Sequence, residues 1–287
     1  MSNVWLITGS SRGLGRAIAE AVLAAGDHLV ATARDPETLA DLAARYPATL
    51  RTAPLDVTDP AAAQAAVALA LDAFGRLDVL VNNAGYGHIA PFEQMDPEAF
   101  RAQMDTNFYG VVNLTRAALP AMRRQGSGHI LQISSVGGRI GNPGLSAYQS
   151  AKWAVGGFTE VLAQELAPLG IRVTTLEPGG MRTNWGFTAK GAVPELLPGY
   201  QPSVGALLTL LEGIVGQENS DPAKVAAVVL QLARHPNPPV HLLLGSDALH
   251  YAGLVEADRD AAAERWGAVS RAVDMTAPAT LPVFPQA

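Results

Sequence analysis

A tyrosine and a lysine four residues apart, Tyr148 and Lys152, are the side chains in this sequence best suited to acid–base chemistry. Positions i and i+4 of a helix share a face, so the phenol and the ammonium would be neighbours. A free phenol has a pKa of about 10, and an adjacent cation favours phenolate. The spacing therefore predicts a lowered pKa at Tyr148, which would act as general acid in reduction and general base in oxidation. Two unrelated side chains on a helix surface would give the same spacing.

A serine is the second candidate group. Ser135 follows an apolar run, 129–134, that predicts a buried strand. The carboxyl end of a parallel strand is where open α/β sheets bind ligands. Ser135 could hydrogen-bond a substrate oxygen beside the phenol and stabilise developing charge. A helix or turn cap is the alternative role.

A glycine-rich turn follows the first apolar run, 4–8. Gly9, Gly13 and Gly15 would allow a tight turn, backbone approach to a pyrophosphate, and close packing of the next helix. The N-terminus of that helix offers free N–H groups and a positive dipole end to phosphates. The turn predicts a dinucleotide site, although its spacing differs from G-x-G-x-x-G and an ordinary strand–helix turn is the alternative.

The end of the second predicted strand, 29–33, bears on the choice of cofactor. An NAD site has an acid there to bind the ribose 2′-hydroxyl, whereas this strand ends in Ala33 followed by Arg34. Arg34 and Arg12 could hold a 2′-phosphate through charge-assisted bonds. Two solvated surface arginines are the alternative. We predict NADP(H), with NADPH preferred over NADH.

The elements that must position these groups alternate between short apolar runs and Ala-rich helical patterns. The predicted strands are 4–8, 29–33, 49–55, 79–82, 129–134, 172–176 and 240–244, and the clearest helical patterns are 15–25, 61–74 and 148–166. Such alternation predicts an α/β fold: a Rossmann-type doubly wound parallel sheet of about seven strands with helices on both faces. We expect one domain over 1–287, a substrate loop at 184–220 and a helical C-terminal extension at 247–287.

Composition excludes several classes of protein. The chain has 287 residues, 48% of them hydrophobic, and a formal net charge of −6, which disfavours nucleic-acid binding. It has no cysteine, so disulfides and thiolate chemistry are excluded. No apolar run would span a bilayer, no signal peptide is visible, and no spacing suggests a metal site. We therefore expect a cytoplasmic protein without a membrane partner.

Five motifs occur in register along the chain: Thr8-Gly-x-x-x-Gly13-x-Gly15, Asn82-Asn83-Ala84-Gly85, the Ser135–Tyr148 spacing, Tyr148-x-x-x-Lys152, and Pro178-Gly179. With them, the chain resembles the short-chain dehydrogenase/reductase family, in its shorter-chain branch, over about residues 3–183. It is similar to NADP(H)-preferring carbonyl reductases. The stretch 31–35 is similar to that of hydroxysteroid and retinol dehydrogenases.

The resemblance implies further roles at matching positions. Asn107 would hold a water in a proton relay to Lys152, Asp56 and Val57 would contact the adenine, and Thr183 would help to orient the nicotinamide. The implied catalytic set is Asn107, Ser135, Tyr148 and Lys152. The implied cofactor-binding set is Gly9, Ser11, Arg12, Gly13, Leu14, Gly15, Arg34, Asp56, Val57, Asn83, Ala84, Gly85, Tyr148, Lys152, Pro178, Gly179 and Thr183.

Residues and resemblance together favour an NADPH-dependent oxidoreductase that reduces a ketone or aldehyde to an alcohol, reversibly. The substrate pocket would be formed largely by apolar residues after Thr183, with two residues after Gly85 able to reach the same cleft: Trp185, Phe187, Leu196, Leu197 and Tyr200, then Tyr86 and His88. The alternatives are a nucleotide-sugar epimerase or dehydratase, and a non-enzymatic NADP(H)-binding redox sensor.

Assembly stays open at this point. The expected partner is a small-molecule carbonyl or alcohol substrate, and a homodimer or homotetramer is possible. The extension at 247–287 could cover the sheet edge through which relatives assemble, so a dimer or monomer is as plausible as a tetramer. Gly156 and Gly157 lie inside the catalytic helix, where each costs about 1 kcal/mol against alanine. We expect close helix–helix packing at this pair, within the chain or at a subunit interface.

Overall fold

The computed structural model describes residues 2–191, 193–276 and 280–285. Its seven parallel strands form one sheet in the order β3-β2-β1-β4-β5-β6-β7. The strands are β1 (Val4–Ile7), β2 (His28–Ala33), β3 (Leu50–Pro54), β4 (Val79–Asn82), β5 (Gly128–Ile133), β6 (Ile171–Pro178) and β7 (His241–Leu244). Every predicted strand is present, with ends shifted by at most two residues. The predicted doubly wound Rossmann-type fold is confirmed, and the order reverses between β1 and β4, where such sheets bind ligands.

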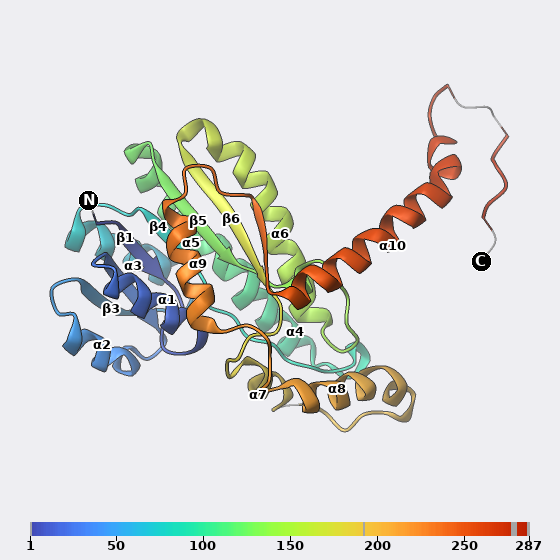
Figure 1. Ribbon diagram of the computed structural model, residues 1–287, viewed down its shortest axis with the longest axis horizontal. Coiled ribbons are helices and arrows are strands. Elements are labelled where there is room, and N and C mark those ends of the chain that lie inside the picture. The colour runs from blue at the N-terminus through green and yellow to red at the C-terminus, as the bar shows by residue number, and fades with distance from the viewer. Residues whose placement is uncertain (1, 192, 277–279, 286–287) are drawn as a thin grey trace.

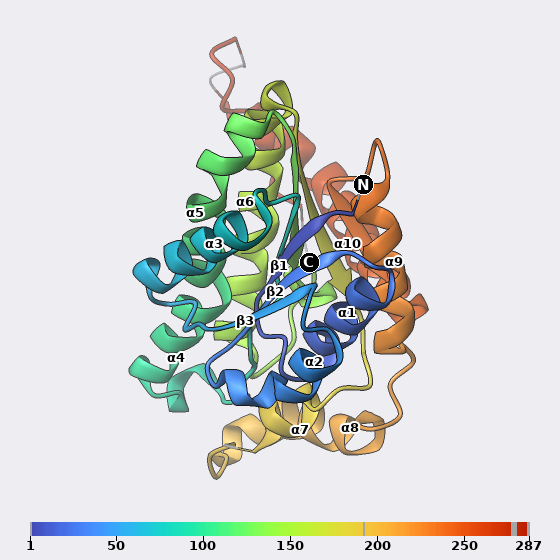
Figure 2. The same cartoon turned by 90° about the vertical axis from the view of Figure 1, so that its left-hand side faces the viewer.

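Helices cover both faces of the sheet, which explains why β1, β4 and β5 are apolar and buried on both sides. On one face lie α1 (Gly13–Ala24), α2 (Ala40–Arg45) and α9 (Pro222–Arg234) (Figure 2). The other face carries α3 (Pro60–Phe74), α5 (Gly110–Gln125) and α6 (Ser146–Leu166), with α4 (Pro97–Met104) beside α6.

Aspartate–proline pairs start three of these helices. The carboxylates of Asp59, Asp96 and Asp221 each accept a hydrogen bond from the backbone N–H two residues later, and a proline follows each at the first helical position. Both features stabilise a helix N-terminus, because the cap satisfies a free donor and proline has no N–H to lose.

The segment after β6 is more helical than the predicted substrate loop at 184–220. It contains α7 (Trp185–Lys190) and α8 (Ala206–Ile214), which lie across the lower end of the sheet in Figure 1. Helix is favoured because Leu207, Leu208 and Leu211 recur at helical spacing and pack in one cluster with Ile89 and Leu145.

The predicted C-terminal helix is present as α10 (Ser246–Arg271). Its N-terminal half is held by the body, through buried Ala248 and Ala252 and through hydrogen bonds of Glu256 and Arg259 to Arg139, and the rest runs away from the sheet (Figure 1). It therefore does not cover the edge strand β7 as the sequence suggested. Among the described residues, no helix combines the length and apolar character needed to cross a membrane.

The expected packing at the α6 glycines is not found within the chain. A Cβ built at Gly157 meets no heavy atom within 4 Å, and one at Gly156 meets only a ring carbon of His241, at 3.9 Å. The described chain brings no second helix there, so a subunit contact stays a prediction.

Candidate active site

The glycine turn sits at the carboxyl end of β1 and has the shape that a diphosphate requires. Gly9 and Gly13 adopt positive φ angles of 68° and 58°, which side chains disfavour. A Cβ at Gly15 would lie 2.3 Å from the Gly9 oxygen and 2.4 Å from Asn83 Nδ2. Glycine therefore lets α1 approach the strand end closely. A helix N-terminus carries free backbone N–H groups that bind phosphate, so the turn fits a dinucleotide. Ser11 and Leu14 lie in this turn and the first turn of α1.

Thr8 ties the glycine turn to the neighbouring strand. Its Oγ1 accepts hydrogen bonds from the N–H groups of Asn83, at 2.9 Å, and Ala84, at 3.0 Å. Asn83 Nδ2 in turn donates to the backbone oxygens of Thr8 and Gly9, at 2.9 and 3.1 Å. This role of Thr8 was missed by the sequence reasoning, where a buried hydroxyl at the end of an apolar strand was the available signal.

Asn107 lies fully buried in a π-turn, Asp105–Tyr109, between α4 and α5. Such turns are frequent at functional sites. Its amide clamps the backbone of Tyr86, with Oδ1 accepting from Tyr86 N at 3.0 Å and Nδ2 donating to Tyr86 O at 2.8 Å. A Cβ at Gly85 would lie 2.9 Å from Asn107 Oδ1 and 3.6 Å from Lys152 Nζ. The structure thus brings Asn107, Gly85 and Lys152 together.

Tyr148 occupies the first turn of α6, and the Ser135 side chain lies near enough to the phenol to act on its pKa. The Ser135 hydroxyl also accepts from Gly137 N at 3.0 Å and so caps the turn Val136–Gly138. The cap role considered for Ser135 is therefore present, and its contact with a substrate oxygen stays a prediction. The adjacent Ser134 is engaged elsewhere, since its hydroxyl donates to the Lys152 backbone oxygen at 3.1 Å.

The predicted lowering of the Tyr148 pKa is wrong for the chain by itself. Burial raises the pKa of Tyr148 to about 12, and the nearby Ser135 side chain opposes this only in part. Lys152 Nζ lies 5.8 Å from the phenol ring centroid and donates to the Ile133 oxygen at 2.7 Å. Burial lowers the pKa of Lys152 to about 8. Desolvation therefore dominates at both groups, and at neutral pH the phenol keeps its proton.

Trp185 covers the phenol from the start of α7, with ring centroids 5.0 Å apart. Gly87 makes room for it, because a Cβ there would lie 2.4 Å from Trp185 Cζ2. Of the other expected pocket residues, Leu196 and Tyr200 pack in the same cluster as Trp185. Phe187 and Leu197 are instead 59% and 48% exposed.

The loop after β4 carries the remaining pocket candidates. The N–H of His88 donates to Gln103 Oε1 at 3.0 Å, as that of Tyr86 does to Asn107. Burial raises the pKa of Tyr86, opposed by the charge of Arg34. The Tyr86 side chain therefore lies close enough to Arg34, which is predicted to select NADP(H), to be affected by its charge.

The residues predicted to favour NADP(H) over NAD(H) follow the ends of β1 and β2. Arg12 and Arg34 are exposed, and within the described ranges neither forms a salt bridge. The nearby carboxylate of Asp35 caps the turn that follows, accepting from Glu37 N at 3.1 Å. The pKa of Asp56 is lowered by hydrogen bonds from Thr58 and by the charge of Arg34.

The remaining predicted residues close the site from the β6 side. Gly179 N donates to the Leu244 oxygen at 2.9 Å, which fixes the chain just after Pro178. Thr183 reaches the glycine turn, since a Cβ at Gly13 would lie 3.6 Å from Thr183 Cβ. Val57 is buried and accepts a hydrogen bond from Asn113.

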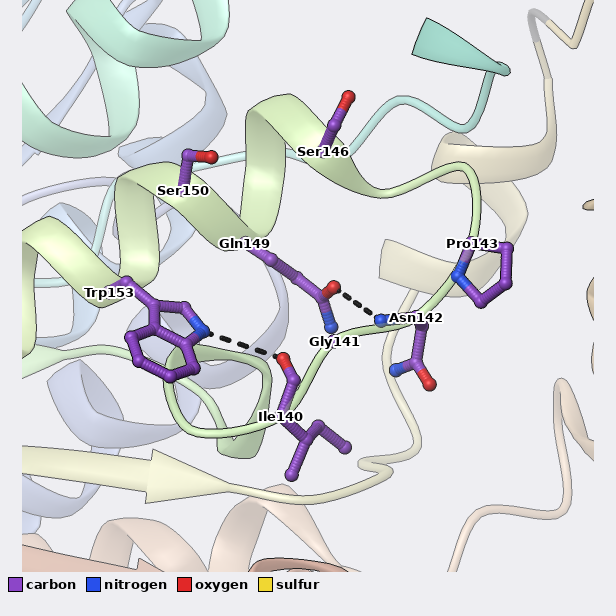
Figure 3. A pocket seen from close by; sticks show the side chains of 8 residues that line it. All are labelled: Ile140, Gly141, Asn142, Pro143, Ser146, Gln149, Ser150 and Trp153. Atoms are coloured by element: carbon purple, nitrogen blue, oxygen red, sulfur yellow. Dashed lines mark hydrogen bonds between the residues drawn. The ribbon is translucent and has the colours of Figure 1, made fainter. Parts of the chain in front are cut away.

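A groove of about 810 Å³ lies beside the catalytic helix, and Tyr148 is absent from its lining (Figure 3). Its floor is the stretch after Arg139, held by Gln149 Oε1, which accepts from Asn142 N at 2.7 Å, and by Trp153 Nε1, which donates to Ile140 O at 3.4 Å. Its other wall is formed by Ser146, Ser150 and neighbouring residues of α6.

Curated relatives resemble the chain over most of their length. Oxidoreductase BOA17 of Botryotinia fuckeliana (strain B05.10) is 50% identical over 274 residues, covering 95% of this chain and 99% of that protein. A 3-ketodihydrosphingosine reductase of Bacteroides thetaiotaomicron is 35% identical over 243 residues, covering 84% and 87%.

Solved structures share the fold. A short-chain dehydrogenase from Streptomyces avermitilis superposes with a TM-score of 0.88 at 41% identity, covering 96% of this chain and all of that one. An NAD complex of a short-chain dehydrogenase/reductase from Burkholderia phymatum gives 0.79 at 26% identity, covering 91% and 95%. An alcohol dehydrogenase from Thermococcus sibiricus complexed with 5-hydroxy-NADP gives 0.70 at 26% identity, covering 85% and 96%.

The family model for short chain dehydrogenases matches residues 3–190, the part of the chain that holds the glycine turn, Asn107, Ser135, Tyr148 and Lys152. This match agrees with the geometry of the site and with the relatives. The chain belongs to the short-chain dehydrogenase/reductase family of oxidoreductases.

Proposed function

We propose that the protein is an NADPH-dependent reductase of ketones or aldehydes that also runs in reverse on the alcohol. One observation carries the proposal: a buried phenol, a serine hydroxyl and a buried ammonium converge at the carboxyl end of β5, beside the glycine turn of β1. When bound, a reduced nicotinamide supplies the hydride.

The chain's own residues would handle the oxygen and the proton. Tyr148 gives its proton to the substrate oxygen, since burial keeps the phenol protonated at neutral pH. The Ser135 hydroxyl holds the same oxygen and stabilises charge that develops on it. Lys152 and Asn107, which lie next to each other behind Gly85, support replacement of the proton.

The preference for NADPH rests on residues at the ends of β1 and β2. Ala33 leaves the strand end without a carboxylate, and Asp35 is occupied as a cap. The exposed guanidinium groups of Arg12 and Arg34 are free to pair with a 2′-phosphate. The related structures hold either NAD or an NADP derivative, so the choice depends on these side chains of the chain itself.

The surroundings of the phenol favour an apolar carbonyl compound. Tyr148 packs with Ile89, Leu145, Val204 and the half-buried Trp185. A pocket of apolar side chains with a few polar groups that orient one atom is the usual arrangement for small-molecule substrates. One relative is named for reduction of a keto compound, 3-ketodihydrosphingosine, which agrees with this class.

The test is a panel of apolar ketones and aldehydes incubated with the protein and NADPH, with nicotinamide absorbance as the readout. We expect net oxidation of NADPH by wild type and its loss in Tyr148→Phe, which keeps the ring and removes the hydroxyl. Cofactor returned unchanged while product forms would support an epimerase instead. Absence of turnover, with biological function intact in Tyr148→Phe, would support a redox sensor.

A further inference from the structure

A buried carboxylate lies next to the segment Pro178–Gly180, which is expected to contact the nicotinamide. Glu177 is the residue before Pro178 on β6, and its side chain is 3% exposed. Arg139 Nε donates to one of its oxygens at 2.5 Å, and His241 Nδ1 lies 2.6 Å from the other. A buried charge is costly unless it is paired and hydrogen-bonded. Both oxygens of Glu177 are therefore engaged and cannot serve substrate.

Arg139 connects this carboxylate to the turn that carries Ser135. Within that turn, Gly138 N donates to the backbone oxygen of Ser135 and Arg139 N to the backbone oxygen of Val136, both at 2.8 Å. The pair Arg139–Glu177 therefore ties the turn that carries Ser135 to the end of β6.

Helix α10 holds the other side of Arg139. Arg139 Nη1 donates to Glu256 at 2.9 Å, and Arg259 Nη2 donates to the Arg139 backbone oxygen at 2.7 Å. The Arg259 guanidinium also lies 4.8 Å from the ring centroid of Trp153 on the catalytic helix. The part of α10 that follows its first turns is thus anchored to the back of the active site before it leaves the body (Figure 1).

A second carboxylate of α10 holds the segment after Pro178. Asp247, in the first turn of α10, accepts from Gly180 N at 2.6 Å through Oδ2. A Cβ at Gly179 would lie 2.4 Å from both carboxylate oxygens, so only glycine admits the carboxylate there. The other oxygen, Oδ1, is buried and has no hydrogen-bond partner among the described residues.

We propose that Arg139, Glu177 and Asp247 are positioning residues through which α10 holds Ser135 and the Pro178–Gly180 segment in register. The proposal rests on the function proposed above, because those two segments hold the substrate oxygen and the nicotinamide. None of the three residues touches the reacting atoms. They act through the backbone they hold, and a displacement of about 1 Å between reacting groups can cost about a hundredfold in rate.

The first experiment compares Arg139→Met with Arg234→Met. Arg234 pairs at 2.9 Å with Asp27, another carboxylate with a side chain only 4% exposed, at the opposite, amino end of the strands. Both changes leave a buried carboxylate without its arginine, and Arg139→Met also breaks the exposed pair with Glu256, so both should lower the melting temperature. Only Arg139→Met should also lower kcat with NADPH, by at least about tenfold. Equal kcat in the two variants would overturn the proposal.

The second experiment uses Asp247, in case Arg139→Met does not fold. Asp247→Asn keeps an oxygen that can accept from Gly180 N, whereas Asp247→Ala removes it. We expect a clear loss of kcat in Asp247→Ala and recovery of most of it in Asp247→Asn. If the alanine variant keeps the wild-type kcat, or if asparagine is as damaging as alanine, the hydrogen bond does not position the segment.

A binding readout separates this proposal from the proposed function. Fluorescence of bound NADPH reports the environment of the nicotinamide and needs no substrate. Arg139→Met and Asp247→Ala should shift that emission toward the free cofactor, while the glycine turn keeps the dissociation constant near the wild-type value. If no carbonyl compound is turned over, the proposed function fails, yet the emission still tests the positioning. Unchanged emission in both variants would overturn it.

Discussion

Replacing Lys152 by methionine should remove a pH dependence from the stability of the cofactor-free protein. Burial lowers the pKa of Lys152 to about 8 in the folded chain, from 10.5 in the unfolded one. Between these values the unfolded chain binds more protons at this site, so the free energy of unfolding rises with pH. The difference between the two pKa values corresponds to about 3 kcal/mol. Below pH 8 the whole of this penalty is present.

The assay is urea unfolding between pH 7 and pH 10. The upper limit matters because burial raises the pKa of Tyr148 to about 12, so above pH 10 the folded protein keeps a proton that the unfolded chain loses, and stability falls. Over the chosen range, the stability of wild type relative to Lys152→Met should rise by about 2 to 3 kcal/mol. Lys224→Met, which removes an exposed ammonium, should leave the wild-type pH dependence in place. A difference in the free energy of unfolding between wild type and Lys152→Met that does not change with pH would refute the burial of this ammonium.

Three further changes test other parts of the site. The double change Ala33→Asp, Arg34→Ala should shift the ratio of kcat/KM for NADPH to that for NADH toward NADH by about 10- to 100-fold. It removes a charge-assisted bond to the 2′-phosphate and adds an acceptor for the ribose hydroxyl. Equal kcat/KM for NADPH and NADH in wild type would count against the pairing of these arginines with a 2′-phosphate. Gly15→Ala should weaken NADPH binding at least about tenfold, because its Cβ would overlap the turn. The control Gly157→Ala has open space at its Cβ and should stabilise α6 by up to about 1 kcal/mol. Titration calorimetry measures the cofactor affinity, and thermal unfolding measures the stability. Equal affinity for NADPH in both variants would contradict the role of the glycine turn in binding the cofactor. Trp185→Ala should lower KM for bulky ketones relative to small ones, since the indole covers the phenol; an unchanged ratio across a ketone series would show that the indole does not limit substrate size.

The sheet and most of the site were predictable because their signals are local. Parallel strands buried on both faces appear as short apolar runs, and the glycine turn follows the first of them without interruption. Helix α4 was overlooked, although Asp96 and Pro97 repeat the start signal seen at Asp59 and Pro60. Helices α7 and α8 were assigned to a loop because prolines and glycines obscured the spacing of their leucines.

The electrostatics of the site depend on contacts that no local pattern contains. The spacing of Tyr148 and Lys152 predicted their shared helix but not the indole of Trp185, which comes from a later segment and packs against the phenol ring. The link from Arg139 to Glu177 and Glu256 joins a turn, a strand and a helix that lie far apart in the sequence. Only the folded chain shows that these charges meet, so neither the direction of the Tyr148 pKa nor the contacts of α10 with Arg139 could be obtained from spacing.

The central claim is that the Tyr148 hydroxyl gives a proton to a carbonyl oxygen beside a bound nicotinamide. Single-turnover oxidation of NADPH with a saturating ketone, compared between wild type and Tyr148→Phe, tests it most directly. We predict a rate at least about a hundredfold lower in the phenylalanine variant, which is the contribution expected of a general acid, with the dissociation constant for NADPH unchanged. A phenylalanine variant that oxidises NADPH at the wild-type rate would contradict the account.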